Sequence, residues 1–155
     1  MKTISGSVQK TLSIGKAIGR RLEPGAIILL GGALGAGKSV LAKGIAMGLG
    51  IKKEDVCSPT FVIMRPHKGR LVLYHFDFYR LRAPRDILSL GYEEYFYAEG
   101  AAVIEWPERL KYLLPKEFLE INLSLVGKSK RCLRFKACGE KYKKVLEGIH
   151  EYIRY

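Results

Sequence analysis

At 155 residues and 48% hydrophobic composition, the chain is expected to fold as one domain, residues 1–155, with a real core; a disordered chain is excluded. Lysine and arginine number 27 against 15 acidic residues, and the net charge of +12 favours anionic partners such as nucleotides, RNA and acidic protein surfaces. No apolar run is long enough for a membrane span, and the segment Met1 to Lys10 lacks the apolar core of a signal peptide. The three cysteines form no CxxC pair, so we expect a cytoplasmic protein without disulfide bonds or a zinc site.

The first part of the chain predicts a helix, a buried strand and a second helix. Apolar residues recur at helical spacing from Ser7 to Leu22, where Gly15 and Gly19 weaken the helix but allow close packing. Ala26 to Leu30 is a short continuous apolar run, as in a central strand that is buried on both faces. After a glycine-rich stretch, a helix is expected from about Gly37 to Leu49.

The middle of the chain predicts a hairpin, a short helix and another buried strand. The two β-prone runs Phe61 to Met64 and Leu71 to Phe76 flank Pro66 to Gly69, which we interpret as the turn of the hairpin. Proline suits the first turn of a helix, so a short helix is expected from Pro84 to about Leu90. Ala101 to Ile104 is the next buried strand.

The last part predicts a second hairpin and a terminal helix. Phe118 to Val126 and Cys132 to Ala137 alternate between apolar and polar residues across the basic turn Gly127 to Lys130. One helical face then carries the apolar residues Tyr142, Val145, Leu146, Ile149, Tyr152 and Ile153. Helices alternating with buried single strands and hairpins predict an α/β sandwich with a mixed sheet and helices on both faces.

The glycine-rich stretch has the pattern of a phosphate-binding loop. It reads Gly32-Ala33-Leu34-Gly35-Ala36-Gly37-Lys38-Ser39 and matches G-x-x-x-x-G-K-[ST]. Glycines let successive backbone N–H groups point at phosphate oxygens, and the following helix aims its positive end at them. Lys38 can reach the β and γ phosphates, and Ser39 offers a hydroxyl oxygen to Mg²⁺. The strand before it and the helix after it argue against a glycine turn without a ligand, and predict a P-loop NTPase of three α/β/α layers.

Two acidic residues follow apolar strands at places that suit the rest of such a site. Asp77 follows the strand Leu71 to Phe76, and Glu105 follows the strand Ala101 to Ile104. Ligands bind beyond the carboxyl ends of strands in open α/β sheets. Both carboxylates can therefore face the phosphate loop and serve Mg²⁺ and its water if their strands lie near the strand that precedes the loop. A helix cap or an exposed surface position is the alternative for each.

Thr60 lies in a loop after the predicted P-loop helix, where nucleotide switches are often found. Its hydroxyl is a candidate to reach the metal or the γ-phosphate and order the loop when ATP is bound. A simple turn before a strand, stabilised by its serine and threonine side chains, is the alternative interpretation.

Four motifs occur in a fixed order along the chain. They are Gly32 to Ser39, Ser58-Pro59-Thr60-Phe61, His75-Phe76-Asp77-Phe78-Tyr79-Arg80 and Ile104-Glu105-Trp106-Pro107. Together they closely resemble the TsaE family, bacterial ATPases of tRNA threonylcarbamoyladenosine biosynthesis. Further residues that fit the family pattern are Gly91, Tyr95-Phe96 and Leu114-Pro115.

The resemblance implies weak ATP hydrolysis that supports two partner proteins, TsaB and TsaD. TsaD transfers the threonylcarbamoyl group to adenosine 37 of tRNAs that read ANN codons, and the ATP cycle of the TsaE protein resets the complex. The match implies that Lys38 neutralises phosphate charge, and that Ser39, Asp77 and Glu105 hold the metal and its waters. It further implies that Thr60 belongs to the switch loop and that Trp106 lies next to the site. It also implies that the segment from Val8 to Thr11, with Thr11 itself, and Arg131 border the adenine.

Two positions depart from the family pattern. The family usually has aspartate where Ala33 stands, and a second threonine where Val40 stands. One carboxylate at the mouth of the loop and one hydroxyl that assists hydrolysis are therefore missing. We expect slow intrinsic turnover, with nucleotide binding less affected.

Two other functions remain open on the sequence alone. A small-molecule kinase shares the phosphate loop, and its phosphate-clamping lid has candidates in Arg65, Arg70, Arg80, Arg82 and Arg85. A basic RNA-binding module without catalysis would use the net charge of +12 and nearby aromatic residues. A basic surface that touches tRNA within the partner complex is compatible with the ATPase as well.

Overall fold

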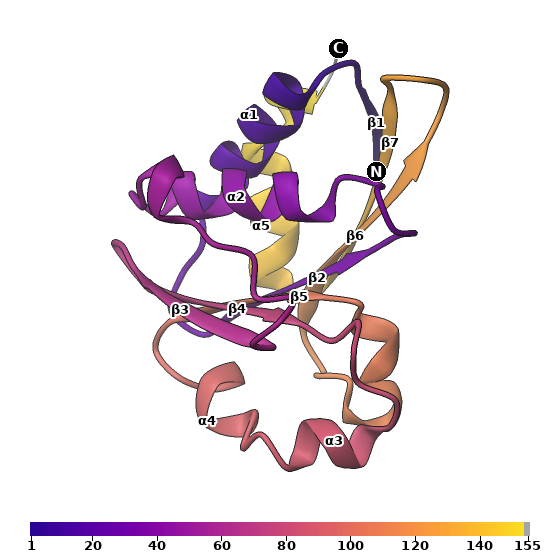
Figure 1. Cartoon of the computed structure of the whole chain (residues 1–155). Coiled ribbons are helices and arrows are strands. Elements are labelled where there is room, and N and C mark those ends of the chain that lie inside the picture. Colours follow the sequence, from indigo (N-terminus) through magenta and orange to yellow (C-terminus); the bar gives the residue numbers. More distant parts are fainter. Residues whose placement is uncertain (154–155) are drawn as a thin grey trace.

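A mixed β-sheet forms the centre of the computed structural model, which describes residues 1–153 (Figure 1). Within these residues the sheet has seven strands in the order β1-β7-β6-β2-β5-β4-β3. The strands are β1 (Lys2–Ser5), β2 (Ala26–Gly31), β3 (Met64–Lys68), β4 (Val72–Asp77), β5 (Ala101–Glu105), β6 (Phe118–Leu125) and β7 (Arg131–Cys138). The four neighbouring strands β4, β5, β2 and β6 are parallel to one another. Strand β3 is antiparallel to β4, and β7 is antiparallel to β6.

Helices cover both faces of the sheet, which confirms the predicted three-layer α/β/α sandwich (Figure 1). One layer contains α1 (Val8–Gly19), α2 (Lys38–Gly48), α5 (Glu140–Gly148) and α6 (His150–Ile153). The other contains α3 (Pro84–Leu88), α4 (Glu93–Phe96) and the 3₁₀ turns η2 (Pro107–Arg109) and η3 (Lys111–Leu113). A further 3₁₀ turn, η1 (Lys53–Asp55), follows α2.

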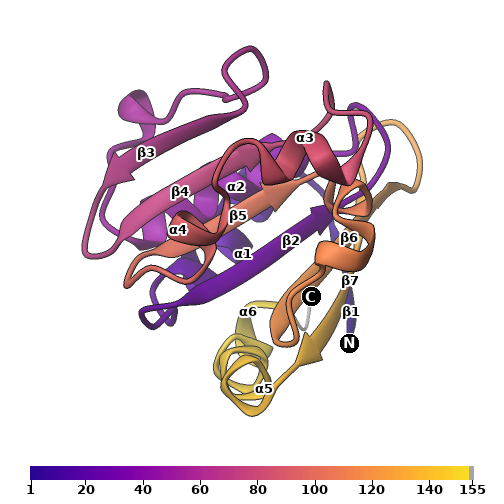
Figure 2. The same ribbon diagram turned by 90° about the horizontal axis from the view of Figure 1, so that it is seen from below.

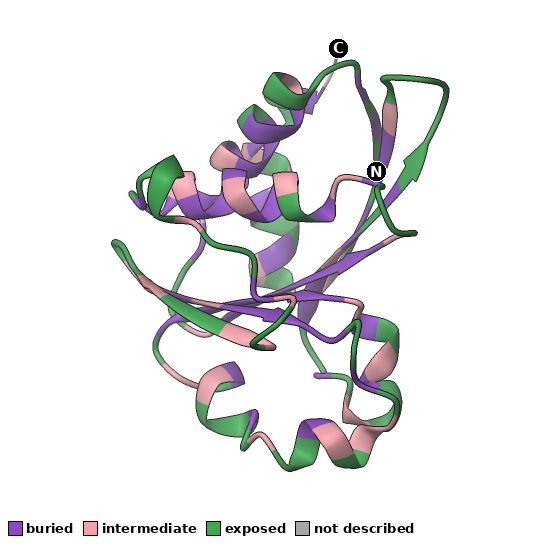
Figure 3. Cartoon of the chain, in the orientation of Figure 1, coloured by how far each residue is buried: buried purple, intermediate pink, exposed green. Residues whose placement is uncertain are grey.

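The central strand β2 is buried along its whole length, as its continuous apolar sequence predicts (Figure 3). Alternate side chains of a strand point to opposite faces, so Ala26, Ile28 and Leu30 pack in the core under α1 and α2. Ile27 and Leu29 pack in the second core, with α3 and α4. The strand that carries the phosphate loop is therefore fixed from both sides.

Glycines bring α1 and α2 into close contact. A Cβ atom on Gly15 would lie 2.6 Å from the carbonyl oxygen of Leu41, and one on Gly44 would lie 2.6 Å from that of Leu12. Gly19 and Gly48 meet in the same way one turn further along the helices. The expectation that glycines in α1 permit close packing is confirmed, and the contact fixes the helix that begins at the phosphate loop.

The first hairpin lies further along the chain than the sequence predicted. Strand β3 begins at Met64, and Pro66 lies within the strand rather than in the turn. Because β3 is at the edge of the sheet, a proline there breaks no ladder on its outer side. Ile63 has a positive φ of 70° and Phe61 is 84% exposed, so the predicted strand Phe61 to Met64 is wrong for its first three residues.

Both ends of the chain also differ from the prediction. Strand β1 was missed because its pairing partner, β7, lies more than 100 residues away in the sequence. The predicted terminal helix is divided into α5 and α6 beside Ile149, and Tyr152 is 41% exposed instead of lying in the core.

Tyr142 supplies a hydrogen-bond partner where the sheet offers none. The N–H of Ile27 donates to the Tyr142 hydroxyl over 2.8 Å, and β6 begins to pair with β2 only at Ile28. Burial raises the pKa of Tyr142 to about 12.

Replacing Tyr142 by phenylalanine leaves a buried N–H without a partner, so we expect the free energy of unfolding to fall by about 1–3 kcal/mol. Urea unfolding measures this change; the control is Tyr112→Phe, at a side chain that is 75% exposed. Equal losses in the two variants would contradict the assignment.

Candidate functional site

The phosphate loop and both predicted acidic residues lie at one edge of the sheet. Strands β2, β5 and β4 are parallel neighbours, and their carboxyl ends meet there. Leu30 at the end of β2 is opposite Glu105, and Glu105 is opposite Asp77. The sequence prediction that these carboxylates face the loop is thus geometrically satisfied.

Three glycines give the loop from Gly32 to Ser39 its shape. Gly32, Gly35 and Gly37 have positive φ angles of 135°, 79° and 106°, which side chains rarely allow. A Cβ on Gly32 would also collide with the carbonyl of Leu123. The loop leads directly into α2, whose first residue is Lys38, so free N–H groups of the helix open into the curve of the loop. This is the backbone form of an anion cradle.

The Lys38 side chain is held inside the loop by the loop itself. Its Nζ donates to the carbonyl oxygens of Gly32 and Ala33, the latter over 2.9 Å, and lies 4.2 Å from the ring centroid of Trp106. Burial lowers the pKa of Lys38, while the charges of Glu105, Glu108 and Asp77 act in the opposite direction. The ammonium group is thus poorly solvated, and anionic oxygens in the cradle would satisfy it better than carbonyl groups.

Ser39 and Glu105 form a hydrogen-bonded pair below the loop. The Ser39 hydroxyl donates to Glu105 Oε1 over 2.9 Å, and His75 Nε2 lies 3.5 Å from Oε2. Burial raises the pKa of Glu105, but His75, the Ser39 hydroxyl and the charge of Lys38 outweigh it, so the pKa lies below its usual value. Glu105 is therefore an ionised carboxylate next to a hydroxyl oxygen, the hard oxygen pair that suits Mg²⁺.

The second carboxylate anchors the predicted switch loop. Thr60 donates from Oγ1 to Asp77 Oδ2 over 2.9 Å, and the N–H of Tyr79 donates to Oδ1 over 2.9 Å. The Ser58 and Thr60 hydroxyl groups are 2.8 Å apart. The structure thus brings Thr60 to the site, where its hydroxyl makes a contact that a ligand at Asp77 would compete for.

Trp106 lies at the mouth of the loop in a constrained conformation. Its φ of 59° is in the left-handed region, which an L side chain seldom adopts, and its ring is 4.9 Å from that of Tyr79. The turn after β5 therefore presents the indole to Lys38, while the half-buried side chain also packs against the second core. The sequence placed Trp106 at the site, and the structure brings it there.

Thr11 and Arg131 border a cavity of about 370 Å³ beside the first turn of α2. Val8 and Val40 supply its apolar wall. The Thr11 hydroxyl is hydrogen-bonded to Ser5 Oγ at 2.7 Å, whereas the Arg131 side chain approaches Gly37 of the loop. The cavity adjoins the phosphate loop, and the remaining residues that line it are Gly6, Ser7, Lys128 and Ser129.

His75 and Tyr79 belong to the site, although the sequence analysis gave them no role. His75 is only 2% exposed and neither of its ring nitrogens has a regular hydrogen bond. The signal was its position two residues before Asp77, which places both side chains on the same face of β4. Its neighbour across that face is the carboxylate of Glu105, which it helps to hold in place.

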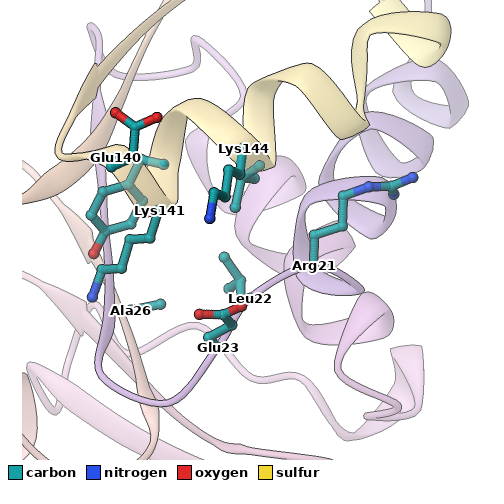
Figure 4. A pocket seen from close by; sticks show the side chains of 9 residues that line it. Arg21, Leu22, Glu23, Ala26, Glu140, Lys141 and Lys144 are labelled. Atoms are coloured by element: carbon teal, nitrogen blue, oxygen red, sulfur yellow. The ribbon is translucent and has the colours of Figure 1, made fainter.

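A separate cavity of about 350 Å³ lies at the amino end of β2, between α5 and the turn that precedes this strand (Figure 4). Figure 4 shows the amino group of Lys144 and the carboxylate of Glu23 turned into it. None of the predicted site residues lines this cavity.

Of the helices in residues 1–153, none has the length and apolar character to span a bilayer.

Comparisons with known proteins agree with this geometry. Residues 5–133 match the family model for "Threonylcarbamoyl adenosine biosynthesis protein TsaE". The TsaE protein of Treponema pallidum is 43% identical over 131 residues, 84% of this chain and 96% of the relative. That of Bacillus subtilis is 37% identical over 145 residues, 93% of this chain and 90% of the relative. The crystal structure of YdiB from Bacillus subtilis superposes with a TM-score of 0.82 at 31% identity, covering 98% of this chain and 95% of that one. The chain belongs to the TsaE family of P-loop NTPases, whose relatives are named for tRNA threonylcarbamoyladenosine biosynthesis.

Proposed function

We propose that the chain binds ATP and ADP with Mg²⁺ at this edge of the sheet and hydrolyses ATP slowly. The observation that carries the proposal is that three contacts lie close together at the carboxyl ends of β2, β5 and β4. They are Lys38 in its glycine cradle, Ser39 with Glu105, and Thr60 with Asp77. A cradle for phosphates, a cation and two metal-type carboxylates are the parts that hydrolysis of a nucleoside triphosphate requires.

Each residue has a role that its present contacts support. Backbone N–H groups from Leu34 to Ser39 bind phosphate oxygens, and Lys38 exchanges the Gly32 and Ala33 carbonyls for them. Ser39, Glu105 and Asp77 hold the metal and its waters, while His75 restrains the Glu105 carboxylate. Bound Mg²⁺ supplies charge neutralisation to the phosphates. The hydrogen bond from Thr60 to Asp77 is kept or broken according to which nucleotide occupies the site. The loop that begins at Ser58 therefore acts as a switch.

The cavity next to the loop suits the base of the nucleotide. Its walls are apolar at Val8 and Val40, and Arg131 stands between the cavity and Gly37 of the loop. A planar base stacks on an apolar wall and on a guanidinium group. Because the hydroxyl of Thr11 is already bonded to Ser5, we assign Thr11 to the shape of the cavity and Arg131 to contact with the nucleotide.

The relatives' names support a role in tRNA threonylcarbamoyladenosine biosynthesis. We infer that the chain supports formation of the threonylcarbamoyl group at adenosine 37 of tRNAs that read ANN codons, together with TsaB and TsaD. It does not carry out the transfer itself; its ATP cycle serves the partner pair. The lack of a carboxylate at Ala33 and of a hydroxyl at Val40 supports an intrinsic rate below about 1 s⁻¹, the lower end of the range for kinases.

Three of the five arginines considered for a kinase lid donate hydrogen bonds to backbone carbonyl oxygens. Arg70 donates to the carbonyl oxygens of Gly19 and Leu22 over 3.1 Å and 2.9 Å, which fixes the end of α1. Arg65 and Arg80 donate to carbonyl oxygens of the loop that carries Thr60. These three guanidinium groups thus have structural partners in the fold, which favours the ATPase over the kinase.

ATP hydrolysis with and without the TsaB–TsaD pair tests the proposal. We expect slow hydrolysis by the chain alone, stimulation by the pair, and loss of both in Lys38→Ala. Lys43→Ala, on the same helix but outside the loop, is the matched control and should behave as wild type. If a folded wild-type chain showed no hydrolysis under either condition while transferring phosphate to a small metabolite, the kinase assignment would replace this one.

A further inference from the structure

One face of the sheet is open at the edge formed by β1, β7 and β6. The pairing register places the even-numbered side chains of these strands on the face away from α1 and α2, with Lys2 opposite Arg134 and Arg134 opposite Asn122. Figure 2 shows α3 and α4 over β4 and β5 instead, while the segment from Pro107 to Leu114 borders β6 across a cavity. The exposed side chains, which we call the open face, are Lys2, Ile4, Asn122, Ser124, Arg134 and Lys136.

The open face carries an excess of positive charge. Lys2 and Arg134 are directly opposite each other on neighbouring strands, an arrangement that costs stability for like charges. Lys136 follows on the same face, where only the half-buried Glu120 lies opposite to it. In the described part of the chain none of these three cations forms an ion pair. A polyanion bound to the face would offset the repulsion.

The turn between β6 and β7 extends this charge. Lys128 and Lys130 are both exposed there, and Arg131 follows at the start of β7 (Figure 3). The turn thus adds two exposed cations next to the open face. Arg131, whose odd number places it on the face toward α1 and α2, borders the cavity beside the phosphate loop instead. In the other direction, a cavity of about 570 Å³ leads from Lys136 to Gly32 of the phosphate loop.

The chemistry of the open face favours a sugar–phosphate backbone over other anionic partners. Its exposed positions carry cations, an amide and a hydroxyl group, and no aromatic side chain on which single-stranded bases would stack. Its apolar member is Ile4, 40% exposed, which is too little for the apolar centre that protein interfaces use. The cavity that Asn122 and Lys136 border is also lined by Glu108 and Glu120, which disfavours a small anion there.

We propose that the open face binds the phosphate backbone of a folded RNA, and that this RNA is a tRNA. The relatives' names connect the family with tRNA, and the charge pattern supplies the means of contact. The proposal goes beyond nucleotide hydrolysis, because the residues that carry it differ from Lys38, Glu105 and Asp77. Binding at phosphates is independent of base sequence and falls steeply with salt.

The test uses the full chain and an unmodified transcript of a tRNA that reads ANN codons. In the test variant Lys2, Arg134 and Lys136 are each replaced by glutamine, and the dissociation constant is measured by fluorescence anisotropy at several salt concentrations. Each phosphate contact contributes about 0.9 to the slope of log K against log salt in a B-form duplex, so we expect the slope to fall by about 2 to 3. At low salt the affinity should fall at least about tenfold.

The matched control removes the same charge elsewhere, and it should bind the tRNA as wild type does. It replaces three exposed lysines outside the open face by glutamine: Lys52, Lys53 and Lys144. Thermal unfolding and ADP binding of both variants confirm that the fold and the nucleotide site are intact. These ADP measurements also separate failure of the present proposal from failure of the proposed ATPase.

Three results would overturn the proposal. They are absence of tRNA binding by wild type, an unchanged affinity and salt slope in the test variant, and an equal loss in the control variant. If the test variant keeps tRNA binding but loses stimulation by the TsaB–TsaD pair, the open face is a protein interface instead.

Discussion

Replacing Lys38 by alanine is expected to weaken the binding of ATP with Mg²⁺ by about a hundredfold or more. The lysine would make at least two charge-assisted hydrogen bonds to phosphate oxygens, each of about 1.5 kcal/mol or more. Their loss exceeds 2.8 kcal/mol, which is about two powers of ten in the dissociation constant. Equilibrium dialysis with labelled ATP measures the change.

The fold should survive this substitution, because it removes a charge that burial makes unfavourable. The pKa of Lys38 is lowered chiefly by burial, so the native state gains little from the ionised side chain. Lys43→Ala provides the control for removing a lysine from α2. Unchanged ATP affinity in Lys38→Ala would mean that the lysine remains on the loop carbonyls and does not serve phosphate.

Replacing Glu105 by glutamine is expected to lower the rate of hydrolysis at least about a hundredfold while the chain still binds ADP. The amide keeps the shape of the side chain and accepts a hydrogen bond from Ser39, but it has no negative charge for the metal and its water. Steady-state release of phosphate, measured with the TsaB–TsaD pair present, gives the rate. Fluorescence of labelled ADP gives the affinity.

Glu99→Gln is the matched control, since Glu99 is exposed and precedes the opposite end of the same strand. It should hydrolyse ATP at the wild-type rate. If Glu105→Gln retained full activity, the carboxylate at the end of β5 would have a purely structural role. Loss of ADP binding as well would place Glu105 in nucleotide affinity rather than in hydrolysis.

The sequence indicated which residues the structure brings together, because the signals for them are local. The glycine pattern determines the backbone of the loop, and an apolar strand before it places the loop at the carboxyl edge of the sheet. Asp77 and Glu105 are the last residues of β4 and β5, one residue later than the predicted strands end, so the same rule placed both of them. The sequence did not determine which strands are neighbours; the structure places β5 beside β2 and β4 beside β5, all three parallel.

The parts that the sequence did not predict depend on contacts between distant segments. Strand β1 exists because β7 pairs with it, and no pattern within Lys2 to Ser5 requires that. The start of β3 is shifted by the left-handed conformation of Ile63, whose carbonyl accepts a hydrogen bond from the N–H of Asp77 over 2.8 Å. Likewise, His75 becomes part of the site only because β5 places Glu105 beside it.

The two departures from the family pattern have different structural meanings. At Ala33 the contact with Lys38 is made by the backbone carbonyl, so the missing side chain does not remove it. Val40 lines the cavity next to the phosphate loop, where an apolar residue suits a base. Both observations agree with the expectation that binding is less affected than turnover.

Isothermal titration calorimetry of the wild-type chain with ADP and ATP in the presence of Mg²⁺ is the most direct test of the nucleotide site. We predict saturable binding at one site per chain, competition between the two nucleotides, and weaker binding when Mg²⁺ is removed. A folded chain that gives no heat of binding and is not stabilised against thermal unfolding by either nucleotide would contradict the assignment of the loop from Gly32 to Ser39.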